Sequence, residues 1–144
     1  DNWVKHRVNN IEFQSLICFE VLDDDHIQSG AVNAEFFVAQ TNNATFGDSY
    51  QAAQQLQITR ARAAELSRQF AVVSTTGLTA HIDQNGNVLT VAEQFRPVAL
   101  EIEIEAFKDR ATTVRGSFLW MGILSVLWLL CVFGQRRSRL VYTR

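Results

Sequence analysis

The stretch IEFQSLICFEVL, Ile11 to Leu22, alternates its side chains with a period of two. One face would carry Ile11, Phe13, Ser15, Ile17, Phe19 and Val21, and the other would carry Glu12, Gln14, Leu16, Cys18, Glu20 and Leu22. Successive side chains of a β-strand point to opposite faces of a sheet, so this pattern predicts a strand.

The segments after this strand predict a turn, a second strand and a helix. DDDHIQSG, residues 23–30, is rich in turn formers, and AVNAEFFVAQ, residues 31–40, alternates again. NNATFGDS, residues 42–49, is the next break in the pattern. From Tyr50 to Val72 the chain is rich in Ala, Gln, Leu and Arg with apolar residues at helical spacing, which predicts one long helix.

Two further segments complete the predicted domain. TAHIDQNGNVLTV, residues 79–91, centres on Asn85 and Gly86, and an Asn-Gly pair between alternating segments predicts a tight hairpin. PVALEIEIEAF, residues 97–107, predicts a last strand with its glutamates facing water and Ile102 and Ile104 in the core. The predicted fold class is α+β, a small, mostly antiparallel sheet with one packed helix.

The segment from Gly116 to Gln135 carries no charged side chain between Arg115 and Arg136. About twenty residues at about 1.5 Å rise each match a hydrocarbon core of about 30 Å. Its apolar side chains cover every direction around a helix, whereas a helix buried in a globular domain usually keeps a polar stripe. We therefore expect a single C-terminal transmembrane helix over residues 116–135.

Charge and the first residue suggest an orientation for this helix. All fifteen acidic residues precede residue 116, while the segment 136–144 carries only basic charges, which favours a cytoplasmic C-terminus. The chain begins with Asp1 rather than Met, which is compatible with a cleaved signal peptide. We expect an extracytoplasmic domain over 1–110, a linker over 111–115, the membrane helix over 116–135 and a cytoplasmic tail over 136–144.

Few residues suggest chemistry. The two cysteines cannot form a disulfide framework, because Cys131 lies in the apolar segment and only Cys18 belongs to the domain. Cys18 has no electropositive neighbour in the sequence and is predicted to be a small buried residue. The run Asp23 to Asp25 with His26 lacks the ligand spacing of a calcium loop and is interpreted as a solvated turn. We therefore expect no catalytic, cofactor-binding or metal-binding residue and no cofactor.

Three residues suggest contacts or modification. Asn43 opens the sequon Asn-Ala-Thr in a predicted loop and is a candidate glycosylation site. Gly122 and Ser125 are small residues on neighbouring helical turns, where a second membrane helix could pack closely.

The predicted function follows from these features. The expected chain is a non-catalytic, single-pass accessory or scaffold subunit of a membrane protein complex, with other membrane subunits and the lipid bilayer as partners. The alternative is a membrane-tethered sensor or small-ligand-binding module. A formal net charge of -2 and the lack of a basic stripe exclude nucleic acid as an expected partner.

Overall fold

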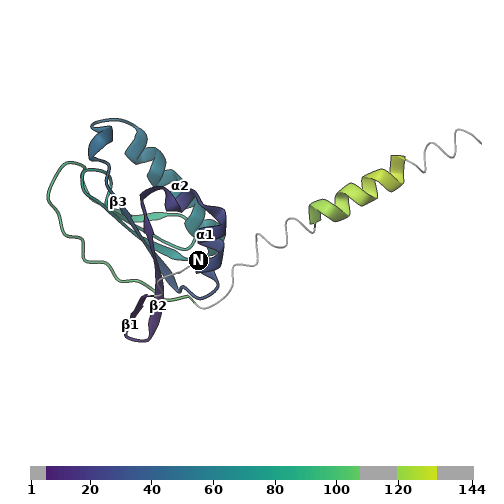
Figure 1. The fold of residues 1–144 in the computed structure, drawn as a ribbon, viewed down its shortest axis with the longest axis horizontal. Coiled ribbons are helices and arrows are strands. Elements are labelled where there is room, and N and C mark those ends of the chain that lie inside the picture. Colours follow the sequence, from purple (N-terminus) through teal and green to yellow (C-terminus); the bar gives the residue numbers. More distant parts are fainter. Residues whose placement is uncertain (1–5, 108–119, 133–144) are drawn as a thin grey trace, which may run out of the picture. The chain divides into compact units, whose positions relative to one another are not determined.

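A computed structural model of the chain describes residues 6–107 and 120–132. The chain divides into two compact units, Asp1–Ala111 and Thr112–Arg144, and each is described by itself (Figure 1). In residues 6–107 the elements are, in order, β1 (His6–Val8), β2 (Ile11–Ile17), the 3₁₀ helix η1 (Cys18–Leu22), α1 (Asp24–Ala31), β3 (Phe36–Thr41), the 3₁₀ helix η2 (Ala44–Phe46), α2 (Gln51–Leu66), β4 (Gln69–Ser74), β5 (Ala80–Ile82) and β6 (Val88–Val91).

The strands of this unit form one sheet in the order β1-β2-β3-β4-β5-β6. Strands β2, β3 and β4 are parallel, and the pairs β1–β2, β4–β5 and β5–β6 are antiparallel. Helix α1 joins β2 to β3, and α2 joins β3 to β4. The predicted α+β class is therefore wrong, because the unit is an α/β fold with a mixed sheet and parallel central strands.

The segment read as a turn explains this error. Residues 24–31 form α1, since the carboxylate of Asp23 caps the helix by accepting a hydrogen bond from the backbone N–H of His26 at 3.0 Å. Ile27 faces the core and is fully buried. A helix between two neighbouring strands lets them run parallel, whereas a turn would have made them antiparallel.

The core lies between the two helices and one face of the sheet. Figure 1 shows α1 and α2 on one side of the sheet, as expected for right-handed crossovers that step in the same direction. The sheet contributes Leu16, Phe37, Ala39, Phe70, Val72, Ala80 and Ile82 to this core, and the helices contribute Ile27, Leu56, Ala63 and Leu66. Phe37 and Phe70 stack with ring centroids 4.8 Å apart at the centre.

Several local predictions can be compared with the structure. The strands in 11–22 and 31–40 are confirmed as β2 and β3, although each is shorter than predicted. The hairpin around Asn85 and Gly86 is confirmed, with β5 and β6 antiparallel and Gly86 at φ 82°. The predicted helix over 50–72 ends early, because Ser67 takes a left-handed conformation and the chain continues as β4.

The predicted strand over 97–107 is wrong. Residues 97–107 have no regular secondary structure. Glu101, Glu103 and Glu105 are exposed as predicted, but Ile102 and Ile104 are only half-buried and lie outside the core cluster.

In the second unit the structure describes a helix over residues 120–132. Such a helix is about 20 Å long at 1.5 Å per residue, short of the roughly 30 Å of a hydrocarbon core. Within the described residues, no helix combines the length and the apolar character needed to cross a membrane. The predicted transmembrane helix over 116–135 is corrected accordingly, and residues 116–119 and 133–135 of that prediction lie outside the described part. The division of the chain at residues 110, 115 and 135, expected from the sequence, stays a prediction.

Candidate active site at the carboxyl edge of the sheet

The parallel strands β2, β3 and β4 end side by side and bring three polar segments together. Cys18 directly follows β2, Thr41 ends β3 and is followed by Asn42 and Asn43, and Ser74 ends β4. Open α/β sheets bind ligands beyond the carboxyl ends of their strands, so this edge is the candidate site.

Cys18 lies at a sharp junction between a strand and a helix. Its φ of 54° falls in the left-handed region, which is uncommon for a residue other than glycine, asparagine or aspartate. The backbone N–H of Ile17 donates to Glu20 Oε2 at 2.6 Å, and the carbonyl of Cys18 accepts from Gln55 Nε2 at 3.2 Å. Strand-to-helix turns of this kind present nucleophiles in hydrolytic enzymes, and the Cys18 side chain is half-buried rather than enclosed.

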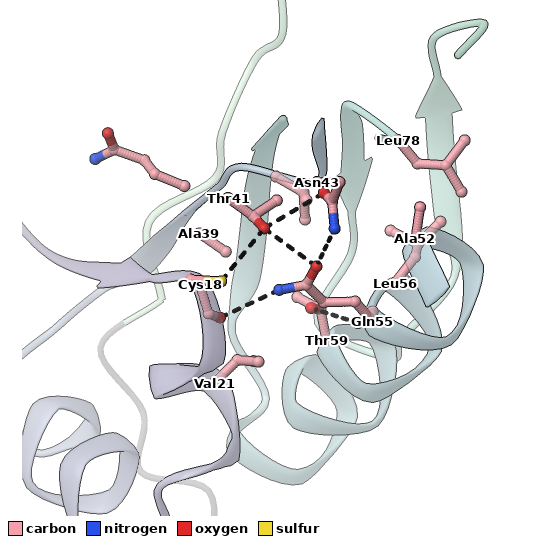
Figure 2. A pocket seen from close by; sticks show the side chains of 12 residues that line it. Cys18, Val21, Ala39, Thr41, Asn43, Ala52, Gln55, Leu56, Thr59 and Leu78 are labelled. Atoms are coloured by element: carbon pink, nitrogen blue, oxygen red, sulfur yellow. Dashed lines mark hydrogen bonds between the residues drawn. The ribbon is translucent and has the colours of Figure 1, made fainter. Parts of the chain in front are cut away.

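A network of polar side chains lies next to this junction (Figure 2). Asn43 is only 3% exposed, and its amide contacts Gln55 at 2.9 Å and Ser74 at 2.7 Å. The Thr41 hydroxyl lies 3.1 Å from Gln55 Oε1 and 3.9 Å from the Cys18 sulfur. The ends of β2, β3 and β4 are thereby linked to one another and to helix α2.

The space around this network is small. The cavity lined by Cys18, Thr41, Asn43 and Gln55 measures about 10 Å³, close to what a single water molecule needs. The network is therefore a packed support, and a reaction partner would approach the thiol from its exposed side. In the described part of the chain, the hydroxyl of Thr41 is the nearest polar side chain recorded for the sulfur, and no basic side chain lies within hydrogen-bond distance.

The residues singled out from the sequence lie in different places. Asn43 is buried in the network, so its side chain is not free for a glycan in this fold, and glycosylation itself stays untested. Gly122 and Ser125 lie in the separate helix 120–132, where a Cβ at Gly122 would meet nothing within 4 Å and the Ser125 hydroxyl donates to Met121 O at 2.8 Å. Their proposed role in helix packing stays a prediction. Among the described residues, no group of three or more acidic, histidine or cysteine side chains could hold a metal ion.

Two solved structures of other proteins have a similar fold. The chain is similar to an amidase of the nitrilase superfamily from Nesterenkonia, with a TM-score of 0.52 and 13% identity over 62% of this chain and 36% of the amidase. It is also similar to the glutamine-dependent NAD+ synthetase of Acinetobacter baumannii, with a TM-score of 0.57 and 15% identity over 67% of this chain and 20% of the synthetase. At these identities the likeness shows the fold alone, a fragment of a nitrilase-like fold.

Sequence similarity adds specific relatives, although no family model matches the chain. The chain is 34% identical to an apolipoprotein N-acyltransferase of Haemophilus ducreyi over 133 residues, which cover 91% of this chain and 26% of that enzyme. It is 32% identical to the apolipoprotein N-acyltransferase of Nitrosomonas europaea, over 86% of this chain and 26% of that enzyme. The chain is therefore related to apolipoprotein N-acyltransferases and spans about a quarter of their length.

These findings overturn the predicted function. The relatives are enzymes, so the expectation of a non-catalytic scaffold subunit, with a sensor module as its alternative, is corrected to an enzyme-related region. The sequence analysis did not select Cys18 as a candidate site residue, because its left-handed backbone conformation cannot be inferred from the sequence. The available signal was a cysteine at the end of an apolar, alternating segment, and that signal is weak.

Proposed function

We propose that this chain provides the nucleophile for N-acylation of an apolipoprotein, with the sulfur of Cys18 carrying the acyl group. The observation that carries the proposal is the position of Cys18 on a strained strand-to-helix junction at the carboxyl edge of the parallel strands. Two similarities support it. The sequence relatives are apolipoprotein N-acyltransferases, and a Nesterenkonia amidase of similar fold binds an acetamide group covalently at its active-site cysteine.

The proposed reaction has two steps. In the first, the Cys18 sulfur attacks the carbonyl carbon of an acyl donor, the bond to the donor's leaving group breaks, and a thioester forms while the leaving group takes up a proton. In the second, an amine of the apolipoprotein attacks the thioester carbonyl. An amide bond then forms, the carbon–sulfur bond breaks, and the sulfur recovers a proton. Both steps need a general base, and among the described residues no basic side chain lies within hydrogen-bond distance of the Cys18 sulfur.

The experiment tests Cys18 by substitution and uses Cys131, the other cysteine of the chain, as the matched control. The natural protein is mixed with para-nitrophenyl hexanoate, and release of nitrophenolate and a hexanoyl thioester sensitive to neutral hydroxylamine are measured. We expect one equivalent of thioester in the wild type and in the Cys131→Ala variant, and none in Cys18→Ala. Peptide mapping should place the acyl group on Cys18. An unchanged thioester in the Cys18→Ala variant contradicts the proposal.

We also propose that the reaction takes place at a membrane, with residues 1–110 on its extracytoplasmic side. The membrane location is supported by the helix over 120–132, whose side chains are all exposed and nearly all apolar in the described unit. The proposed side is supported by the charges of the sequence, because all fifteen acidic residues precede residue 116 and residues 136–144 carry only basic charges. The Ser125 hydroxyl is bonded to a carbonyl of its own helix, so it needs no water as a partner. Apolar surface of this extent is stabilised by contact with lipid rather than with water.

A further inference from the structure

We propose that Gln55 of helix α2 is a positioning residue that fixes the carbonyl of Cys18 and thereby aims the thiol. This inference rests on the proposed role of Cys18 as the nucleophile. It starts from a geometric requirement, because a left-handed φ at a residue with a Cβ is unfavourable and relaxes unless surrounding contacts hold it. The side-chain contact recorded for the Cys18 carbonyl is the one from Gln55 Nε2, at 3.2 Å.

The orientation of the Gln55 amide follows from its partners. A backbone carbonyl can only accept, so the nitrogen of Gln55 must face Cys18, and Oε1 must face the other way. There it accepts from Asn43 Nδ2 at 2.9 Å and is 3.1 Å from the Thr41 hydroxyl. An inverted Gln55 amide would place two acceptors against each other at Cys18.

The same reasoning extends across the network. Since the nitrogen of Asn43 faces Gln55, its Oδ1 must accept, and the Ser74 hydroxyl donates to it at 2.7 Å. The oxygen of Ser74 in turn accepts from the backbone N–H of Gly77 at 2.8 Å. The hydrogen bonds therefore run in one direction, from the N–H of Gly77 through Ser74, Asn43 and Gln55 to the carbonyl of Cys18.

The two ends of this chain of hydrogen bonds are held by the fold. Gly77 is buried, and a Cβ there would lie 2.6 Å from the Ser74 oxygen and would collide with the Asn43 amide oxygen, so the loop after β4 approaches the network closely because it has no side chain. Gln55 is flanked on α2 by the buried residues Ala52, Leu56 and Thr59, so its backbone cannot shift without disturbing the core. The backbone at Cys18 is therefore linked, through its hydrogen bond to Gln55, to a helix that packs on the core.

The role of Gln55 can be tested with two substitutions that remove the donor differently. Gln55→Glu keeps the shape and the acceptors but cannot donate when ionised, and Gln55→Met removes the amide without adding charge. Gln54→Glu, at an exposed neighbouring position on the same helix, is the charge-matched control. The readouts are the rate of nitrophenolate release from para-nitrophenyl hexanoate, the rate of thiol alkylation by iodoacetamide, and the unfolding temperature.

We expect Gln55→Glu and Gln55→Met to slow acylation about 10- to 100-fold, the range seen when the hydrogen-bond partner that orients a metal ligand is removed, while Gln54→Glu acylates like the wild type. Lowering the pH protonates the introduced carboxyl group and restores a donor, so the deficit of Gln55→Glu relative to wild type should shrink, whereas that of Gln55→Met should not. A purely structural role would lower the unfolding temperature without this pH dependence.

The outcomes separate the two proposals. If Cys18→Ala still forms the thioester, the proposed function fails, whatever Gln55 does. If Cys18 is required but the folded Gln55→Met or Gln55→Glu protein acylates at the rate of the Gln54→Glu control, the role of Gln55 alone is refuted. If one of the two variants does not fold, the other decides by the same criterion.

Discussion

At the scale of single residues, left-handed backbone has different origins at different positions. Asn9 and Asn10, with φ of 47° and 66°, form the two-residue turn between β1 and β2, where asparagine is well suited to positive φ. Ser67, at φ 51°, ends helix α2 in the usual left-handed cap. Cys18 has neither of these local reasons, and its carbonyl accepts a hydrogen bond from Gln55 of helix α2. The left-handed conformation of Cys18 is one observation behind its proposed role as the nucleophile.

His81 is a buried histidine on the sheet face opposite the helices. It is 5% exposed, and its Nε2 lies 2.9 Å from Gln69 Oε1, which also accepts from the backbone N–H of Glu105 at 3.3 Å. Burial lowers the pKa of His81, and the charge of Asp83 offsets this only in part. The folded protein therefore favours the neutral imidazole.

This burial predicts a pH dependence of stability. Below the ordinary histidine pKa of about 6.5, the unfolded chain takes up a proton that the folded chain still excludes, so the free energy of unfolding should fall as the pH drops from about 7 to 5. The stabilisation that comes from the buried, neutral His81 is fully present above that pKa. Urea unfolding of wild type and His81→Gln at several pH values measures it. We expect a shallower slope in His81→Gln than in a His6→Gln control, and equal slopes would contradict this assignment.

At the scale of elements, Arg62 links helix α2 by hydrogen bonds to residues 21–24, which follow the Cys18 junction. Its guanidinium donates to Val21 O at 3.0 Å, to Leu22 O at 3.3 Å and to Glu65 at 2.7 Å, and it pairs with Asp24. Burial alone would lower the pKa of Arg62, but Glu65 and Asp24 outweigh burial and raise it. The planar fork of arginine is needed to reach these partners together.

Replacing Arg62 by lysine keeps the positive charge but removes the planar guanidinium group and its several N–H donors. We expect Arg62→Lys to lower the free energy of unfolding by about 1 to 3 kcal/mol, because hydrogen bonds to partly buried carbonyls and carboxylates are lost. Arg96, whose pair with Glu93 at 3.2 Å is largely exposed, is the control. Arg96→Lys should change stability by less than about 0.5 kcal/mol. Chemical denaturation of both variants measures the difference, and equal effects would show that Arg62 does not anchor α2.

At the scale of the whole molecule, the proposed membrane location makes a topological prediction. If residues 1–110 are extracytoplasmic, a protease added to cells with a permeable outer layer but an intact inner membrane should digest this part of the chain. A cytoplasmic protein serves as the control for membrane integrity, and detergent should make no further difference to residues 1–110. Full protection until detergent is added would contradict the proposed side.

Some features of this protein follow from the sequence by itself. Alternation in 11–22 and 31–40 correctly predicted two strands, Asn85 and Gly86 predicted the hairpin, and helical spacing predicted the start of α2. These signals are local, because side-chain periodicity and turn chemistry act over a few residues. The end of α2 was missed because Phe70 continues the helical spacing, although it belongs to β4.

Only the tertiary structure decided the parallel pairing and the site. The direction of β3 relative to β2 depends on the short helix α1, whose sequence resembles a turn and whose one fully buried residue, Ile27, reaches a core built from distant segments. The carbonyl of the left-handed Cys18 accepts a hydrogen bond from Gln55, 37 positions away. Neither contact leaves a periodic pattern in the chain, since each joins residues that meet only after the sheet has formed.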